Sequence, residues 1–177
     1  MKQLRRAISL MICVLMMNIS VSIAQEKVSL DVNSHGEKFE HFWSECVGAG
    51  RANEGLRAGW LEQMEKVQQD CGFKTVRFHG LFHDDMFPIV KAGGKDVYNW
   101  QYIDDLFDRL LELDVRPFIE LGFFPTGMAA ENSQTVFWWK ANVTPGEDTF
   151  RKWHDLVLAF TQHCVDRYGL EEVRTWY

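Results

Sequence analysis

Two histidines and two aspartates follow a short stretch of mixed apolar and polar residues near the middle of the chain. Residues 73–78 combine aromatic, β-branched and polar side chains after a glycine, a composition that predicts a β-strand. His79 stands where this strand should end, and His83, Asp84 and Asp85 come shortly after it. In α/β proteins the loops that follow strands commonly carry the functional side chains. The pattern therefore predicts a polar site at this position.

A metal centre is one interpretation of this cluster. Two histidines separated by three residues bind zinc when both rings share one face of a helix. Gly80 and the preceding strand oppose such a helix here. We therefore predict no metal and no cofactor, and we expect His83, Asp84 and Asp85 to be solvated or to brace the loop.

Residues 1–24 have the pattern of a secretory signal peptide. Three basic residues precede an apolar segment, and small side chains occupy the −3 and −1 positions before Gln25. The apolar segment is short and contains polar residues, which opposes a membrane anchor. We expect export, cleavage before Gln25, and a secreted or periplasmic protein that is not held in the membrane.

The remaining 153 residues would carry 16 Lys and Arg against 25 Asp and Glu, a net charge of −9. This acidic balance argues against nucleic acid and anionic membrane surfaces as partners. The chain is rich in aromatic residues, including seven Trp, which would suit sugar rings if exposed but equally a large aromatic core. Cys46, Cys71 and Cys164 are too few for a disulfide framework, and we expect buried free thiols.

Expected strands and helices alternate along the chain. We predict strands at 28–32, 41–47, 73–78, 115–121 and 173–177. Helices are expected at 54–69, from Asn99 to 111, and from a Thr144 cap to Gly169. A hairpin is expected at 88–97, with its turn at Gly93-Gly94. Repeated strand–helix units predict a parallel α/β sheet. Long loops after strands and the lack of a Gly-rich phosphate loop favour a (β/α)₈ barrel over a doubly wound sheet. A closed barrel takes about 250 residues, so we expect its N-terminal half, about three and a half βα units, or else a compact α/β domain.

Several motifs stand out along the chain: Phe42-Trp43, Val47-Gly48-Ala49-Gly50-Arg51, Val76-Arg77-Phe78-His79-Gly80, Tyr98-Asn99 to Asp104-Asp105, residues 116–123, 134–139 and 142–145, and Arg167-Tyr168-Gly169. Together they resemble glycoside hydrolase family 39, which holds β-xylosidases and α-L-iduronidases. The resemblance spans residues 39–177 and is greater for the β-xylosidase branch. It implies a (β/α)₈ barrel in 41–177, with 25–40 as a β segment of an accessory sandwich.

The resemblance also implies retaining hydrolysis by two glutamates that follow strands four and seven. The first belongs to an Asn-Glu-Pro motif expected beyond Trp176-Tyr177, and the second lies further on. We therefore predict no catalytic residue in this sequence, and we expect the chain by itself to be inactive.

Substrate-binding residues can be carried over from the family. The resemblance implies that His79 contacts the sugar in the −1 subsite, although local backbone could satisfy its ring instead. Trp43 near the first strand, Glu120 on the third, and Phe123 and Trp138 in the long loop are further candidates. Glu120 could equally be held by hydrogen bonds inside a barrel, and the aromatic residues could be loop packing. The expected partner is a xylo-oligosaccharide, and the alternative is a non-catalytic or partner-completed sugar-binding half-barrel, or iduronidase-like specificity within the family.

Overall fold

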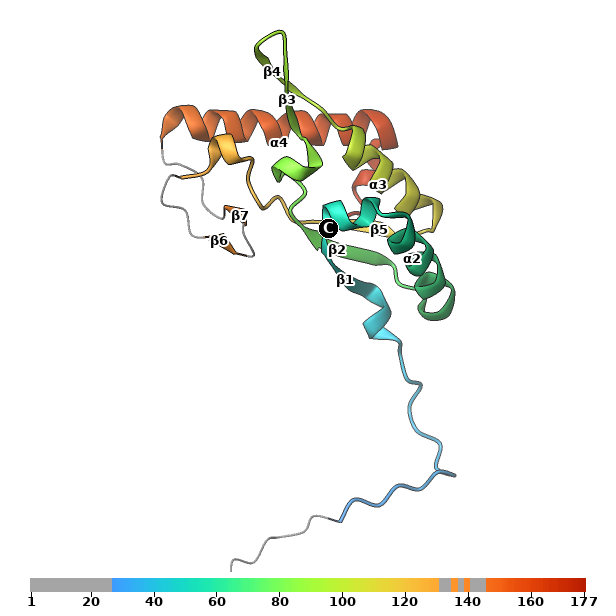
Figure 1. Ribbon diagram of the computed structural model, residues 1–177. Coiled ribbons are helices and arrows are strands. Elements are labelled where there is room, and N and C mark those ends of the chain that lie inside the picture. Colours follow the sequence, from blue (N-terminus) through green and yellow to red (C-terminus); the bar gives the residue numbers. More distant parts are fainter. Residues whose placement is uncertain (1–26, 131–134, 137–138, 141–145) are drawn as a thin grey trace, which may run out of the picture. The chain divides into compact units, whose positions relative to one another are not determined.

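The computed structural model describes residues 27–130, 135–136, 139–140 and 146–177 (Figure 1). The described residues divide into two units, 27–39 and Glu40–Tyr177, and each is considered by itself. The predicted signal peptide, Trp138, Thr144 and Pro145 lie outside the described residues. No helix within the described ranges is long and apolar enough to cross a membrane.

The first unit contains no strand, so the prediction for residues 28–32 is wrong at the level of secondary structure. Val28, Leu30 and Val32 are 80–92% exposed. A turn does form nearby, where the Ser34 amide donates to the Asp31 carbonyl over 3.2 Å. An extended segment needs a partner strand for its backbone groups, and the alternating sequence alone does not supply one. The accessory-sandwich role stays a prediction.

The second unit is built on a parallel three-stranded sheet, which confirms the predicted α/β class. The strands are β1 (Cys46–Arg51), β2 (Thr75–His79) and β5 (Arg116–Ile119), in the spatial order β1-β2-β5. Val76 lies opposite Val47 on one side and Pro117 on the other. The first strand was predicted too early, because Phe42–Glu45 form a 3₁₀ turn (η1) and the glycine-rich run belongs to the strand itself. Pairing with β2 outweighs the low strand preference of glycine there.

Three long helices alternate with these strands. They are α2 (Ala58–Cys71), α3 (Gln101–Glu112) and α4 (Glu147–Tyr168). A 3₁₀ turn at Ala52–Leu56 (η2) precedes α2, so this helix begins later than predicted. Gly72 ends it in the left-handed conformation at φ 63°, as a glycine readily does.

The starts of α3 and α4 differ slightly from prediction. The side-chain oxygen of Asn99 accepts a hydrogen bond from the Gln101 amide over 3.5 Å, although the capping position itself belongs to Trp100. Gly146 rather than Thr144 occupies the capping position of α4, and Gly169 ends that helix as predicted.

The predicted strand at 173–177 is replaced by a short helix, α5 (Leu170–Val173), and a turn. One strand-like contact remains, in which the Ile119 amide donates to the Tyr177 carbonyl over 2.7 Å. The chain therefore returns to the outer edge of β5 but makes no ladder with it.

The hydrophobic core lies between the sheet and the helices. Its largest fully buried side chains include Phe82, Phe107, Leu81, Met86, Ile103, Leu106, Leu110, Leu156 and Val76. Phe78 of β2 faces α3, with its ring 6.2 Å from that of Phe107. Side chains alternate along a strand, so the neighbouring Arg77 lies on the other face of the sheet and is exposed.

The burial of the cysteines depends on which face of the sheet or helix they occupy. Cys164 on α4 is buried as predicted, and burial together with the nearby Asp104 raises the pKa of its thiol to about 12. Cys46 is exposed, contrary to prediction, because β1 is an edge strand and this residue lies on the face that the helices do not cover. Cys71 is half-buried.

Long connections leave the carboxyl ends of β2 and β5. After β2 come a 3₁₀ turn at Asp84–Met86 (η3) and the predicted hairpin of β3 (Ile89–Ala92) and β4 (Lys95–Tyr98). Gly93 and Gly94 both have positive φ, as a tight two-residue hairpin requires. After β5 come a 3₁₀ turn at Thr126–Met128 (η4) and the paired short strands β6 (Thr135–Val136) and β7 (Trp139–Lys140).

Candidate functional site

His79 occupies the carboxyl end of β2, where the sequence placed it. Its ring meets the ring of Phe123 edge to face, with centroids 5.5 Å apart and planes at 86°. Phe123 belongs to the loop after β5, and the Gly80 amide donates to the Gly122 carbonyl, which joins this loop to the one after β2. The structure therefore brings together two of the predicted sugar-binding residues, an imidazole and an aromatic ring.

Asp85 connects the loops after β1 and β2. Its carboxylate lies 3.1 Å from Arg51 Nη1 and 3.2 Å from His83 Nδ1, and its backbone carbonyl accepts a hydrogen bond from Asn53 Nδ2 over 2.9 Å. Arg51 ends β1, and Asn53 lies in the turn that follows.

Asp84 connects the loop after β2 to the loop after β5. Its Oδ1 accepts a hydrogen bond from the Thr126 amide in η4 over 3.0 Å. Together the two aspartates tie the loops after β1, β2 and β5 to one another, which confirms the loop-bracing interpretation. Across the described part of the chain, no three His, Cys, Asp or Glu side chains converge as a metal site would need.

Glu120 stands immediately after β5 and is ion-paired. Its Oε1 lies 3.0 Å from Nε of Arg77, which comes from the neighbouring strand β2. The guanidinium of Arg77 also lies 5.8 Å from the centre of the Phe118 ring. A carboxylate held in this way favours the interpretation of Glu120 as a hydrogen-bonded barrel residue over a free sugar ligand. Arg77 was not predicted, although strand alternation places it on the same face as His79.

Trp43 lies far from the predicted site along the strand direction. It belongs to η1, before β1 begins, and its ring packs 6.0 Å from Phe73 and 5.1 Å from His41. Phe73 precedes β2, so Trp43 is at the amino-terminal end of the sheet and His79 at the carboxyl end. The structure therefore does not bring Trp43 together with His79, because β1 begins later than predicted, and a sugar contact by Trp43 stays a prediction.

The two neighbouring phenylalanines of the long loop have different roles. Phe123 faces His79, whereas the ring of Phe124 packs edge to face on Trp153 of α4 at 4.7 Å. Loop packing was the alternative interpretation for these aromatic residues, and it applies to Phe124.

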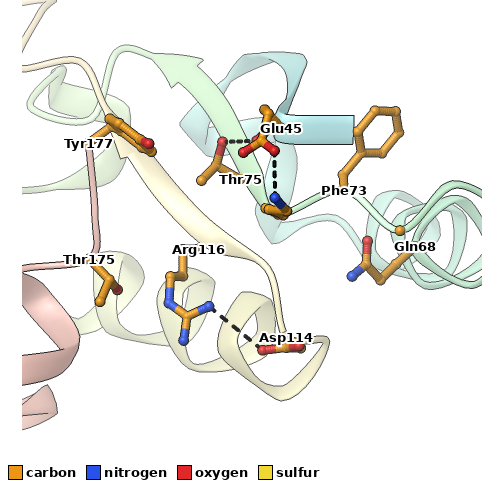
Figure 2. A pocket seen from close by; sticks show the side chains of 10 residues that line it. Glu45, Gln68, Phe73, Thr75, Asp114, Arg116, Thr175 and Tyr177 are labelled. Atoms are coloured by element: carbon orange, nitrogen blue, oxygen red, sulfur yellow. Dashed lines mark hydrogen bonds and ion pairs between the residues drawn. The ribbon is translucent and has the colours of Figure 1, made fainter. Parts of the chain in front are cut away.

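A cavity of about 690 Å³ lies at the amino-terminal end of the sheet (Figure 2). Arg116 lines it and makes a two-pronged pair with Glu172, at 2.8 and 3.2 Å. Lys74, which also lines it, pairs with Glu45. Parallel sheets bind ligands at the carboxyl ends of their strands, and the charged groups here are matched to one another. We therefore locate the candidate site at His79 and not in this cavity.

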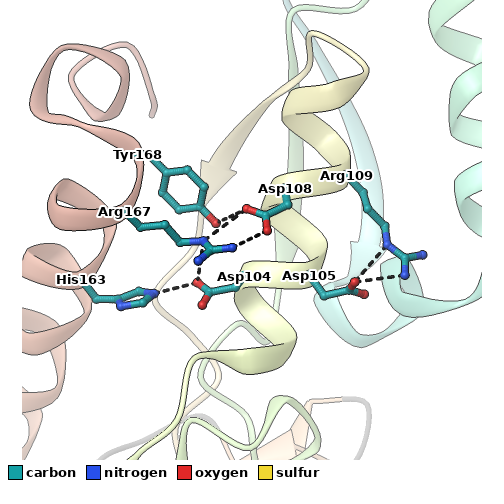
Figure 3. A network of polar contacts seen from close by, with 7 residues as sticks. All are labelled: Asp104, Asp105, Asp108, Arg109, His163, Arg167 and Tyr168. Atoms are coloured by element: carbon teal, nitrogen blue, oxygen red, sulfur yellow. Dashed lines mark hydrogen bonds and ion pairs between the residues drawn. The ribbon is translucent and has the colours of Figure 1, made fainter.

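A second polar cluster joins α3 to α4 (Figure 3). Asp104 lies 2.7 Å from His163 Nε2, and Asp108 accepts hydrogen bonds from Arg167 and, over 3.0 Å, from the Tyr168 hydroxyl. The Arg167 bond holds the pKa of the Asp108 carboxyl below its usual range. Arg167 also lies 3.7 Å from Asp104, so it links the two carboxylates, and the cluster serves as a clamp between two helices.

Comparison with known proteins gives one consistent answer. The sequence model described as glycosyl hydrolases family 39 matches residues 26–177. A β-xylosidase of Geobacillus stearothermophilus is 46% identical over 152 residues, covering 83% of this chain and 30% of its own. One of Caldicellulosiruptor saccharolyticus is 36% identical over 152 residues, covering 85% and 31%.

The solved structures agree. A family 39 β-xylosidase from Caulobacter crescentus superimposes with a TM-score of 0.69 at 36% identity, over 76% of this chain and 30% of that one. The chain thus spans a little under one third of the length of the curated relatives.

Proposed function

The chain belongs to glycosyl hydrolases family 39, and on that basis we propose that it forms the first part of a retaining β-xylosidase acting on xylo-oligosaccharides. In this proposal residues 41–177 are the first three and a half or so βα units of a (β/α)₈ barrel. The parallel order β1-β2-β5 and the likeness to solved family members support it.

The observation that carries the proposal is the pairing of His79 with Phe123 at the carboxyl end of the sheet. An imidazole can exchange hydrogen bonds with sugar hydroxyls, and an aromatic ring can pack against the apolar face of a pyranose. The loops that bear both residues are tied by the Gly80–Gly122 hydrogen bond and by Asp84. The two side chains are therefore held in place before a sugar arrives.

The charges around the site favour a neutral sugar over a uronic acid. Recognition of a sugar carboxylate calls for a cation that can pair with it. Arg51 is paired with Asp85, and Arg77 with Glu120. A xyloside fits this charge balance better than an iduronide, which is the alternative within the family.

Hydrolysis with retention requires two carboxyl groups about 5 Å apart, one as nucleophile and one as acid and base. The carboxylates described near His79 are Asp84, Asp85 and Glu120, and each is engaged in bracing or in an ion pair. We propose that the 177-residue chain binds sugar at this end of the sheet without cleaving it.

Binding and cleavage can be tested on the same sample. Titration with xylobiose, followed by NMR, should shift the His79 and Phe123 resonances, and should leave exposed His154 on α4 unmoved as an internal control. A uronic acid disaccharide should shift them less. Xylobiose that left His79 unperturbed would contradict the site, and enzyme-like turnover of nitrophenyl-β-xyloside would contradict the proposed inactivity.

Export is part of the proposal and rests on residues 1–24 alone. Expression with the native N-terminus should give a secreted or periplasmic protein whose first residue is Gln25. N-terminal sequencing that recovers Met1 from the purified protein would refute it.

A further inference from the structure

Three partly exposed aromatic side chains lie around the base of the β3–β4 hairpin. Phe87 is 48% exposed, Tyr98 37% and Tyr102 43%. Phe87 precedes β3, Tyr98 ends β4, and Tyr102 stands in the first turn of α3. The Phe87 and Tyr102 rings are 5.6 Å apart. We call these three residues the hairpin-base aromatics.

The base of the hairpin is held by Asn99. Its Nδ2 donates to the Phe87 carbonyl over 3.0 Å, and its backbone amide donates to the Pro88 carbonyl over 3.0 Å. Phe87 itself adopts a left-handed backbone at φ 52°, which is uncommon for a bulky residue. The surrounding structure therefore holds the backbone at this position, and the ring itself contacts Tyr102.

The Tyr98 ring is the first of three stacked rings. It stacks on Trp100 at 5.7 Å and 26°, and Trp100 stacks on His163 of α4 at 5.7 Å and 28°. His163 is anchored by Asp104 over 2.7 Å, as Figure 3 shows. Rings that are already ordered lose little conformational freedom when a ligand packs on them.

The exposed area restricts what can bind. Three aromatic side chains exposed to this degree offer roughly 200–300 Å² in total. A stable protein–protein interface buries about 800 Å² on each partner. The three side chains by themselves offer well under half of that area, and their size suits a few sugar rings, each packed against one aromatic side chain.

The patch also belongs to the same connection as the candidate site. The loop that begins after His79 passes through Asp84 and Asp85 and reaches Phe87. The Phe87 amide donates to the Asp84 carbonyl over 3.0 Å, so the patch adjoins the turn that braces the loops of the candidate site. A linear ligand bound at the end of β2 could therefore extend to the base of the hairpin.

We propose that the hairpin-base aromatics form a second carbohydrate-binding surface, which holds the distal units of a neutral xylan chain. The inference rests on the proposed function for the identity of the sugar. It adds a surface that favours long substrates over short ones.

The test compares ligand length on the 177-residue chain by calorimetric or NMR titration. Phe87→Asn with Tyr102→Ala removes two rings, and Asn tolerates the left-handed backbone at position 87. We expect the Kd for xylohexaose to rise about tenfold or more and the Kd for xylobiose to stay unchanged. Phe150→Ala, which truncates a 57% exposed phenylalanine on α4, is the matched control and should change neither. Tyr102→Phe retains the ring and should bind like the parent.

Failure of this proposal and failure of the proposed function give different results. Xylobiose binding with no added affinity for xylohexaose would overturn the surface alone. Ring-dependent xylohexaose binding without xylobiose binding would support the surface and contradict the His79 site. Equal losses in Phe150→Ala, no xylohexaose binding by the parent chain, or a dimer in sedimentation that the double variant dissociates would each overturn the surface.

Discussion

The two ends of the parallel sheet are built differently. At the amino-terminal end the connections are short, a few residues between α2 and β2 and again between α3 and β5, and side-chain ion pairs such as Arg116–Glu172 hold them. At the carboxyl end the connections after β2 and β5 are long, and Asp84 and Asp85 hold them through the Thr126 amide, Arg51 and Asn53. The same strands thus have one end suited to stability and another that is free to carry chemistry.

A choice by cavity volume would have placed the candidate site at the amino-terminal end of the sheet. The hollow of about 690 Å³ lies at the amino-terminal end, among charges that neutralise one another. The His79–Phe123 pair lies at the other end. Strand direction, and not cavity volume, therefore locates the candidate site.

The comparison predicts its largest effect at the amino-terminal end. Arg116→Ala should lower the free energy of unfolding by about 2 kcal/mol, because it leaves the Glu172 carboxylate without its two-pronged partner. The side chains of this pair are 34% and 29% exposed. Urea denaturation measures the change.

Lys74→Ala is the matched control for that variant. The Lys74–Glu45 pair is 63% and 56% exposed, so its loss should cost less than about 1 kcal/mol. Neither variant should alter the affinity for xylobiose. Equal losses of stability, or a loss of affinity in Arg116→Ala, would break the division between the two ends.

At the carboxyl end we expect a loss of affinity with little loss of stability. His79→Ala should raise the Kd for xylobiose about tenfold, a loss of about 1.4 kcal/mol in binding. Its thermal midpoint should stay close to that of the parent, because the ring contributes to the site and not to the buried core. A variant that melted early while binding normally would assign His79 a structural role.

The bracing aspartates should show an intermediate result. Asp85→Asn removes the charge that pairs with Arg51 and His83, and we expect a loss of about 1 kcal/mol in stability and a several-fold weaker affinity for xylobiose. Asp84→Asn keeps an oxygen acceptor for the Thr126 amide and should cost less. Hydrogen exchange at Thr126 separates the two positions: Asp84→Ala, which removes the acceptor of the Thr126 amide, should speed exchange there, and Asp85→Asn should not.

The smallest effect is a pH dependence of the amino-terminal end. Burial raises the pKa of Glu172, but hydrogen bonds from Arg116 and Trp176 outweigh it and hold the pKa below its usual range. A carboxyl whose pKa is lowered by folding adds stability above its unfolded pKa of about 4.3, and this is lost as the pH falls through the folded pKa. Stability should therefore decline below about pH 4.3 by less than about 1 kcal/mol. Glu172→Gln should show a flatter profile over that range.

Local sequence signals predicted the elements that depend on local structure. The Gly93-Gly94 turn and the apolar face of α3 are as expected, and the alternation of strands and helices gave the parallel sheet. The start of β1 was misplaced because it is fixed by pairing with β2, and Trp43 therefore lies before the strand and not in it. The partners of Asp84 and Asp85 could not be predicted from the sequence either. Thr126 is 42 residues from Asp84, and only the fold brings the two together.

The strand β2 has a consequence for how this sequence can change over evolution. Phe78 belongs to the core and His79 to the site, yet they are adjacent in a strand of five residues. Inserting or deleting a single residue within Thr75–His79 would turn the imidazole toward α3 and the phenyl ring toward solvent, so folding and sugar recognition would be lost together. The exposed tip of the β3–β4 hairpin at Gly93-Gly94 carries no such penalty, and we expect length variation among relatives to concentrate there.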